Sequence, residues 1–192
     1  MERLEKYLVQ YCAPTLACLK TANLFSCPES MLPALYESLA GWNICMRGKG
    51  IKLCLLKEEG NALVYVYRVG KLESDLMQPA AFRILKGCGY ETAKEEGAIC
   101  TLKERLKKSG EFPHEIGLFL GYPPGDVRGF IRYGGRCFKC TGCWKVYGDE
   151  EAARRVFARF ERCRRAYMRL WQAGESIMQL TVAATEDTKD FD

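Results

Sequence analysis

Two β-rich runs, separated by only a short connection, most strongly constrain the fold of this 192-residue chain. The runs are IKLCLLK at residues 51–57 and ALVYVYR at residues 62–68, and EEGN lies between them. Branched and aromatic residues favour strands, and a short connection containing glycine is typical of a β-hairpin. The sequence therefore predicts an antiparallel strand pair that the other segments must cover.

Helical spacing of apolar residues predicts helices on both sides of this hairpin. At the N-terminus we expect one helix up to about Tyr11 and a second from Pro14 to about Leu24, because the residue before a proline avoids the helical region. Other helices are predicted over residues 30–46, over residues 71–109 in two or three pieces broken near Pro79 and GCGY, and over residues 150–173 after the N-cap Asp149.

Short strands are predicted at CWKVY, residues 143–147, and at SIMQLTV, residues 176–182. Together the elements predict a single α+β domain over residues 1–184, with helices packed on a small mixed sheet of about four strands. The acidic segment TEDTKDFD, residues 185–192, is predicted to be a disordered tail.

Residues 113–121 fit two structures, an apolar strand or a short helix. The helix is slightly favoured because Pro113 and Glu115 suit a first turn. Two helices here would resemble a helix-turn-helix unit, but the second would offer a DNA groove little beyond Arg128 and Arg132. Helix packing explains the pattern more simply.

Composition places the chain among globular proteins, since 48% of its residues are hydrophobic and a core can form without disulfides. Neither a signal peptide nor an apolar run long enough to cross a bilayer is visible, so we expect a cytoplasmic protein with no membrane partner. There its 11 cysteines should be mostly reduced. The net charge of +5 is too modest to imply nucleic acid by itself.

Several segments together resemble a bacterial domain-of-unknown-function family, number 3793, found mainly in anaerobic Firmicutes: CAPTLACLKTANLF, ALVYVYR, FPHEIGLFLGYPPGDVRGFI, CWKVYGD and LTVAA. The resemblance covers about residues 4–184 and implies one full-length domain, without an established activity. Anaerobic hosts are compatible with oxygen-sensitive thiol or iron chemistry. Positions that match the family's pattern include Cys12, His114, Cys140 and Cys163, whereas the family often carries other residues at Cys137 and Cys143.

Three cysteines in RCFKCTGCWKVYGD, namely Cys137, Cys140 and Cys143, share the spacing of part of a ferredoxin cluster motif. The usual fourth cysteine is absent, so Cys163, Cys12 or another distant thiol would complete an iron–sulfur site. Zinc needs only one C-x-x-C pair together with Cys163 or His114. Dithiol redox chemistry is a third interpretation. In a fourth, the cysteines are small hydrophobic residues in a glycine-rich loop.

Cys12 and His114 form a candidate catalytic pair, because His114 is the single histidine of the chain. Cys12 would lie just before the helix predicted to start at Pro14, and a helix N-terminus lowers the pKa of a thiol. No sequence signature brings the two residues together, and no orienting Asn or Asp is identifiable.

Arginines recur along one side of the predicted helix at residues 150–173, opposite its apolar stripe: Arg155, Arg159, Arg162, Arg165 and Arg169. Such a face can bind phosphate or an acidic protein. It can also be an ordinary solvated face, partly balanced by Glu161 and the acidic tail.

Three functional hypotheses follow, and whether the protein is an enzyme stays open. The leading one is an accessory protein that binds zinc or an iron–sulfur cluster, or that exchanges electrons or thiols with a protein redox partner. The second is a binding module without chemistry that uses the arginine face for nucleic acid or an acidic protein. The third is a Cys-His hydrolase.

Overall fold

The computed structural model describes residues 2–58, 60–108 and 112–184, so the predicted tail at 185–192 lies outside the described residues. Its helices are α1 (Glu2–Leu16), α2 (Leu32–Met46), α3 (Val69–Met77), α4 (Pro79–Gly87), α5 (Glu95–Lys108), α6 (Ile116–Phe119), α7 (Pro124–Tyr133), α8 (Glu150–Gln172) and α9 (Ile177–Leu180), with 3-10 turns η1 (Glu29–Met31) and η2 (Arg47–Lys49). Its strands are β1 (Ala22–Cys27), β2 (Ile51–Lys57), β3 (Ala62–Arg68), β4 (Cys140–Thr141) and β5 (Lys145–Val146).

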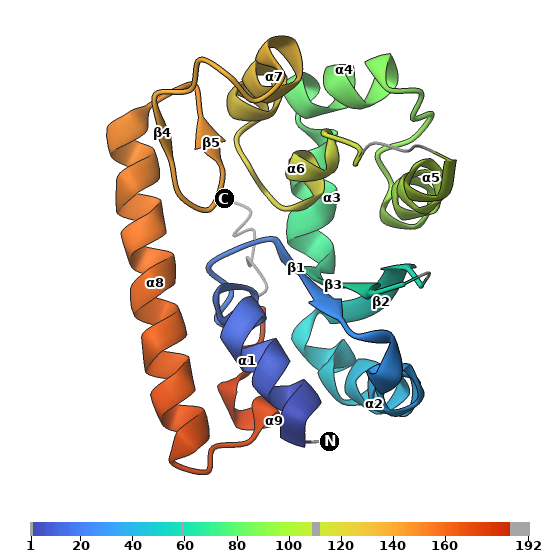
Figure 1. Cartoon of the computed structure of the whole chain (residues 1–192), viewed down its shortest axis with the longest axis vertical. Helices are drawn as coiled ribbons and strands as arrows, with labels where there is room; N and C mark the ends of the chain where they lie inside the picture. The colour runs from blue at the N-terminus through green and yellow to red at the C-terminus, as the bar shows by residue number, and fades with distance from the viewer. Residues whose placement is uncertain (1, 59, 109–111, 185–192) are drawn as a thin grey trace, which may run out of the picture.

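The predicted hairpin forms over the expected residues as β2 and β3, and the α+β fold class is confirmed. Within the described residues the main sheet has three strands in the order β1-β3-β2, and both pairings are antiparallel. The sheet is therefore smaller than the mixed one of about four strands that the sequence suggested. β4 and β5 form a separate two-stranded ribbon beside α8 (Figure 1).

The central strand β3 divides the core into two layers, because successive side chains of a strand point to opposite faces. Val64 and Val66 pack with α1, α2 and α9 on one face. Tyr65 and Tyr67 pack with residues of α3 to α7 on the other. The long helix α8 runs along one side of the molecule next to α1 (Figure 1). In the described part of the chain no helix is both long and apolar enough to cross a membrane.

Two predicted elements at the N-terminus were wrong. Pro14 does not end the first helix but lies inside its last turn, and α1 continues to Leu16. The segment expected to be helical up to Leu24 instead enters β1 at Ala22. β1 pairs with β3 along its whole length, and this long-range pairing overrides the local helical pattern.

The C-terminal strand prediction was also wrong, since residues 177–180 form the helix α9. Ser176 accepts from the backbone of Gln179, and the Gln179 side chain accepts from the Ser176 backbone, so a capping box starts the helix. The strand expected at residues 143–147 is reduced to Lys145–Val146. The helical interpretation of residues 113–121 is confirmed by α6.

The end of α1 is closed by a Schellman motif in which Cys18 takes the left-handed conformation, with φ of 57°. The N–H of Leu19 donates to the carbonyl of Pro14 over 2.9 Å, and that of Cys18 to Thr15 over 3.1 Å. The N–H of Lys20 donates to Pro14 as well, over 3.0 Å. This turn reverses the chain and fixes the position of Lys20.

Arg68, at the end of β3, is only 1% exposed and binds the backbone of two other elements. Its guanidinium donates to the carbonyl oxygens of Thr15 over 2.8 Å and Leu16 over 2.6 Å, at the end of α1. A third bond of 2.9 Å reaches the carbonyl of Lys49 in η2. Arg68 thus satisfies helix-end carbonyls that have no partner within their own helix.

The C-terminal segment joins the same cluster of backbone groups. The Lys49 ammonium donates to the carbonyls of Met178 over 2.5 Å and Thr181 over 2.6 Å, at the end of α9. The N–H of Val182 donates to the carbonyl of Leu16 over 3.0 Å. The end of α1 and the C-terminal segment are therefore held together beside the end of the central strand.

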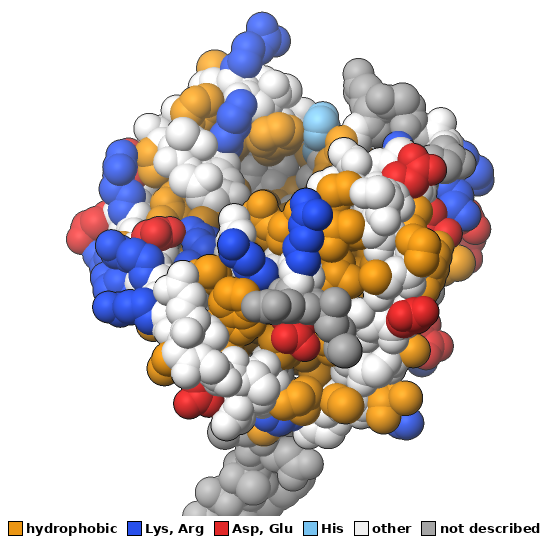
Figure 2. Space-filling view, turned by 60° about the horizontal axis from the view of Figure 1, so that its bottom comes forward, with side chains coloured by type: hydrophobic (Ala, Val, Ile, Leu, Met, Phe, Trp, Pro, Cys, Tyr) orange, Lys and Arg blue, Asp and Glu red, His pale blue; other side chains and the backbone are white. Residues whose placement is uncertain are grey.

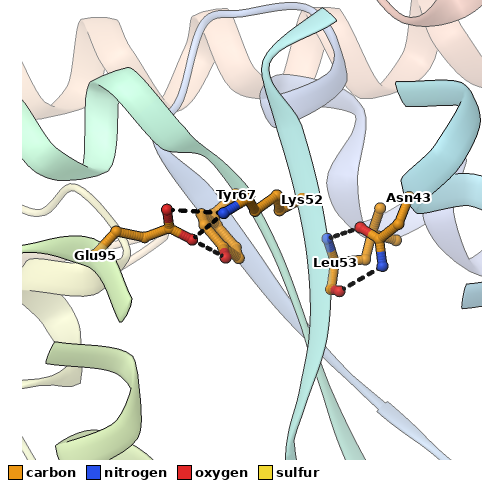
Figure 3. Close-up of polar contacts among 5 residues, drawn as sticks. All are labelled: Asn43, Lys52, Leu53, Tyr67 and Glu95. Carbon is orange, nitrogen blue, oxygen red and sulfur yellow. Dashed lines mark hydrogen bonds and ion pairs between the residues drawn. The ribbon is translucent and has the colours of Figure 1, made fainter. Parts of the chain in front are cut away.

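On the other face, α5 is anchored to the hairpin by a buried carboxylate (Figure 3). Glu95 accepts from the hydroxyl of Tyr67 over 2.5 Å and from the ammonium of Lys52 over 3.0 Å. Nearby, the amide of Asn43 in α2 both donates to the carbonyl of Leu53 and accepts from its N–H, over 2.9 and 2.8 Å. These contacts fix α5 and α2 on the strand β2.

Replacing Arg68 by methionine should lower the free energy of unfolding by about 3 kcal/mol or more, because three hydrogen bonds to a charged donor are lost at a buried site. Urea denaturation would measure the change. Arg128→Met, at an exposed position of α7, is the control and should be nearly neutral. Equal, small losses in both variants would contradict the anchoring role of Arg68.

Candidate functional site

The three clustered cysteines face three different surroundings. Cys137 is exposed and takes a left-handed conformation with φ of 57°. Cys140, in β4, is buried and packs with Val146 and Ala153, where the ribbon meets α8. Cys143 is half-buried and lines a cleft between the ribbon, α1 and α8. The regular spacing of these residues therefore does not place their thiols around one centre.

Gly142, between the second and third cysteine, is explained by packing. A Cβ atom there would lie 2.3 Å from the ring of Phe157, so only glycine lets the ribbon approach α8 this closely. Gly134 is the left-handed C-cap of α7, with φ of 58°. These two glycines thus have structural roles of their own.

Among the residues that the structure describes, no three His, Cys, Asp or Glu side chains come together as a group that could hold a metal ion. Cys163 lies half-buried on α8, where burial raises the pKa of its thiol to about 11. Metal or iron–sulfur binding stays a prediction for the residues named from the sequence: Cys137, Cys140, Cys143, Cys163 and His114.

The candidate catalytic pair is not brought together. Cys12 lies inside α1, fully buried in the core on one face of the sheet, and burial raises the pKa of its thiol far above the ordinary value. His114 is exposed in the turn before α6, and the centres of the His114 and Phe130 rings lie 4.9 Å apart in an edge-to-face arrangement. It lines a cavity of about 270 Å³ beside α7 and the ribbon, and no cysteine is among the described residues lining that cavity.

A cleft of about 750 Å³ lies between α1, the ribbon and α8, and it brings Cys143 together with two basic residues that the sequence did not single out. Lys20 from the α1–β1 turn, Cys143 from the ribbon and Arg164 from α8 line it. Aromatic walls surround these three groups: Tyr11, Tyr122, Phe157 and Phe160. Three separate parts of the chain thus build one site.

Lys20 is the unusual member of this cleft, because it is only 8% exposed and pairs with no carboxylate of the described residues. Its ammonium lies 5.2 Å from the centre of the Tyr122 ring, a cation–π contact. Burial lowers the pKa of Lys20 to about 8; the thiols of Cys143 and Cys12 partly oppose this effect, and Arg164 adds to it. A buried cation without a counterion is costly, so this position is chemically distinctive.

Arg164 and Tyr122 hold the other side of the cleft. The guanidinium of Arg164 donates to Glu161 over 3.0 Å. Burial lowers the pKa of Arg164, but its hydrogen bonds with Glu161 and with the thiol of Cys143 outweigh burial and raise the pKa above its ordinary value. The hydroxyl of Tyr122 donates to the carbonyl of Cys143 over 3.0 Å. These contacts fix Cys143 opposite Lys20.

The arginine face of α8, defined as Arg155, Arg159, Arg162, Arg165 and Arg169, is exposed at every position. Arg155 pairs with Glu151 at 2.5 Å, and Arg165 with Glu161 at 3.8 Å. The other three have no carboxylate partner among the described residues: Arg159, Arg162 and Arg169. Figure 2 shows basic side chains gathered at the edge of the molecule where α8 runs.

A shallow groove of about 800 Å³ follows this face between α8 and α1. Four arginines of α8 line it together with Gln10 of α1: Arg162, Arg164, Arg165 and Arg169. Arg164 and Gln10 also line the Lys20 cleft, so the groove and the cleft adjoin.

Comparison with known proteins gives a family but no activity. The model of a family described as "Protein of unknown function (DUF3793)" matches residues 8–181, which confirms the resemblance seen in the sequence. No curated protein and no solved structure matches the chain. The interpretation of the site therefore depends on its own geometry.

Cys12 should resist alkylation by iodoacetamide near neutral pH, because its thiol is fully buried and burial favours the protonated form. The exposed thiols Cys45, Cys100 and Cys137 should react first and serve as internal controls. Peptide mass spectrometry after timed labelling measures each rate. Rapid labelling of Cys12 in the folded protein would instead support the Cys-His hydrolase.

Replacing Lys20 by methionine should change how stability depends on pH. In the folded chain its pKa is about 8, against an ordinary value of 10.5. Below a pH of about 8 the folded state therefore bears the whole free-energy cost of burying the charged ammonium. This cost disappears as the pH rises toward 10.5, the pKa of Lys20 in the unfolded chain. Between these two pKa values the wild type should gain stability relative to Lys20→Met by up to about 1.4 kcal/mol per pH unit.

Urea denaturation at several pH values between about 7 and 10 would measure this difference. Lys86→Met is a matched control, because the ammonium of Lys86 also lies 5.2 Å from a ring centre, that of Phe82, but the side chain is exposed. A pH-independent difference between wild type and Lys20→Met would show that the pKa of Lys20 is unaltered by folding.

Proposed function

We propose that this chain, which belongs to the DUF3793 family of proteins of unknown function, is a binding module that docks an anionic partner on the arginine face of α8. The observation that supports this function is the set of three exposed arginines without a carboxylate partner among the described residues: Arg159, Arg162 and Arg169. Anionic groups of a partner would pair with these guanidinium groups and release the counterions that a basic surface attracts.

The length and composition of α8 favour the same function. The helix has 23 residues, which makes it about 35 Å long, and every basic residue in it is an arginine. A guanidinium binds phosphate or carboxylate through two parallel hydrogen bonds, a geometry that lysine does not offer. The partner classes proposed are therefore nucleic acid, through its phosphates, and an acidic protein, through its carboxylates.

Other features fit a module that binds rather than reacts. The hydrophobic side of α8 packs through Tyr167 and Trp171 on the core, so the arginines stand on a firmly held helix. The dispersed cysteines give no comparable support to metal or redox chemistry. A cytoplasmic location, expected from the sequence, is part of the proposal, because both partner classes occur there.

The double variant Arg162→Glu/Arg169→Glu should bind a single-stranded oligonucleotide at least about 10-fold more weakly than wild type. Both side chains are exposed, so folding should be unaffected. Neither side chain lines the Lys20 cleft. Fluorescence anisotropy at low and high salt measures the affinity, and the variant should also show a smaller salt dependence.

Arg128→Glu/Arg132→Glu on α7 is the matched control, with the same charge change at two exposed positions. It should retain most of the affinity, because only net charge changes. Polyglutamate, tested in parallel, distinguishes an acidic protein from nucleic acid as the partner class. Absence of binding to either polyanion at low salt, or equal weakening in both double variants, would overturn the proposal.

A further inference from the structure

Lys20 lines two clefts, and this position suggests a ligand site separate from the arginine face. The first is the Lys20 cleft already described, of about 750 Å³. The second has a volume of about 380 Å³, and Lys71 and Arg159 also line it. Lys20 and Phe160 are common to both linings. The ammonium group of Lys20 lies over the ring of Tyr122, which lines the larger of these two clefts but not the smaller, so the larger cleft is where a ligand would meet the charge.

The carboxylates around these clefts are already engaged. Asp126 accepts from the indole of Trp144 and from two backbone N–H groups, and Asp149 caps α8 by accepting from Ala152. Glu161 accepts from Arg164. No carboxylate of the described residues lies within ion-pair distance of Lys20. The positive charge here lacks a counterion that the described residues could supply.

We propose that the Lys20 cleft binds a small organic anion, with Lys20 and Arg164 holding its phosphate or carboxylate group. A bound anion would offset the cost of burying Lys20, which neither the Tyr122 ring nor the neighbouring thiols do fully. The site does not depend on docking at the α8 surface, because Lys20 is not part of the arginine face.

The walls of the cleft define the organic part of the ligand. Tyr11, Tyr122, Phe157 and Phe160 present aromatic surface, and the polar residue Asn23 also belongs to the lining. The volume lies within the range of sites that bind small molecules. The ligand class that fits is an apolar or aromatic body carrying one anionic group.

Binding of phenyl phosphate and of benzoate, measured by isothermal titration calorimetry, tests the proposal. The wild type should bind at least one of the probes, and Lys20→Met should bind it at least about 10-fold more weakly. Lys20→Arg keeps the charge and should retain part of the affinity. The exposed Lys86→Met should match the wild type. The stronger probe identifies phosphate or carboxylate as the preferred group.

Protection of Cys143 gives a second readout, because its thiol lines the same cleft. The bound probe should slow alkylation of Cys143 several-fold and leave that of the exposed Cys137 unchanged.

Should Lys20→Met not fold, Arg164→Gln tests the same cleft. Binding should persist in Arg162→Glu/Arg169→Glu, which separates this site from the docking surface. Equal affinity in wild type and Lys20→Met, or no binding of either probe to the wild type, would overturn the proposal.

Discussion

The buried guanidinium of Arg68 is the interaction on which the rest of the architecture depends. It lies at the end of the central strand and binds carbonyl oxygens of α1 and η2. The same carbonyl groups receive the C-terminal segment, because the Leu16 carbonyl also accepts from Val182. One side chain therefore links the beginning, the middle and the end of the described chain, and it does so through backbone atoms rather than an ion pair.

The closure of α1 also creates the candidate ligand site. Arg68 fixes the end of the helix, and the left-handed Cys18 reverses the chain there. Lys20 consequently lies in the cleft beside α8 and the ribbon. The close approach of Gly142 to Phe157 then brings Cys143 to the opposite wall. The cleft thus results from two backbone constraints, and its chemistry follows from the single charged side chain that these constraints bury.

Local signals were sufficient for the β2–β3 hairpin, for α8 and for its exposed arginines, because in each case the pattern acts between residues close in sequence. They failed for β1, whose partner strand lies about 40 residues further along the chain. Lys20 could not be singled out, because its burial requires α8 and the ribbon to pack over a lysine that looks ordinary in sequence. Cysteine spacing could not show the surroundings of each thiol for a related reason: Cys137 is exposed, Cys140 is buried in a two-residue strand and Cys143 is half-buried, and only the packing of the ribbon on α8 sets these differences.

The two hydrogen bonds between the Asn43 amide and the Leu53 backbone have a consequence for the protein in solution. β2 is an edge strand, and an open edge invites pairing with a strand of another molecule. Both backbone groups of Leu53 are already bound by the Asn43 amide, so an incoming strand cannot hydrogen-bond there. A side chain from α2 thereby protects this edge against aggregation while it fastens the helix to the sheet.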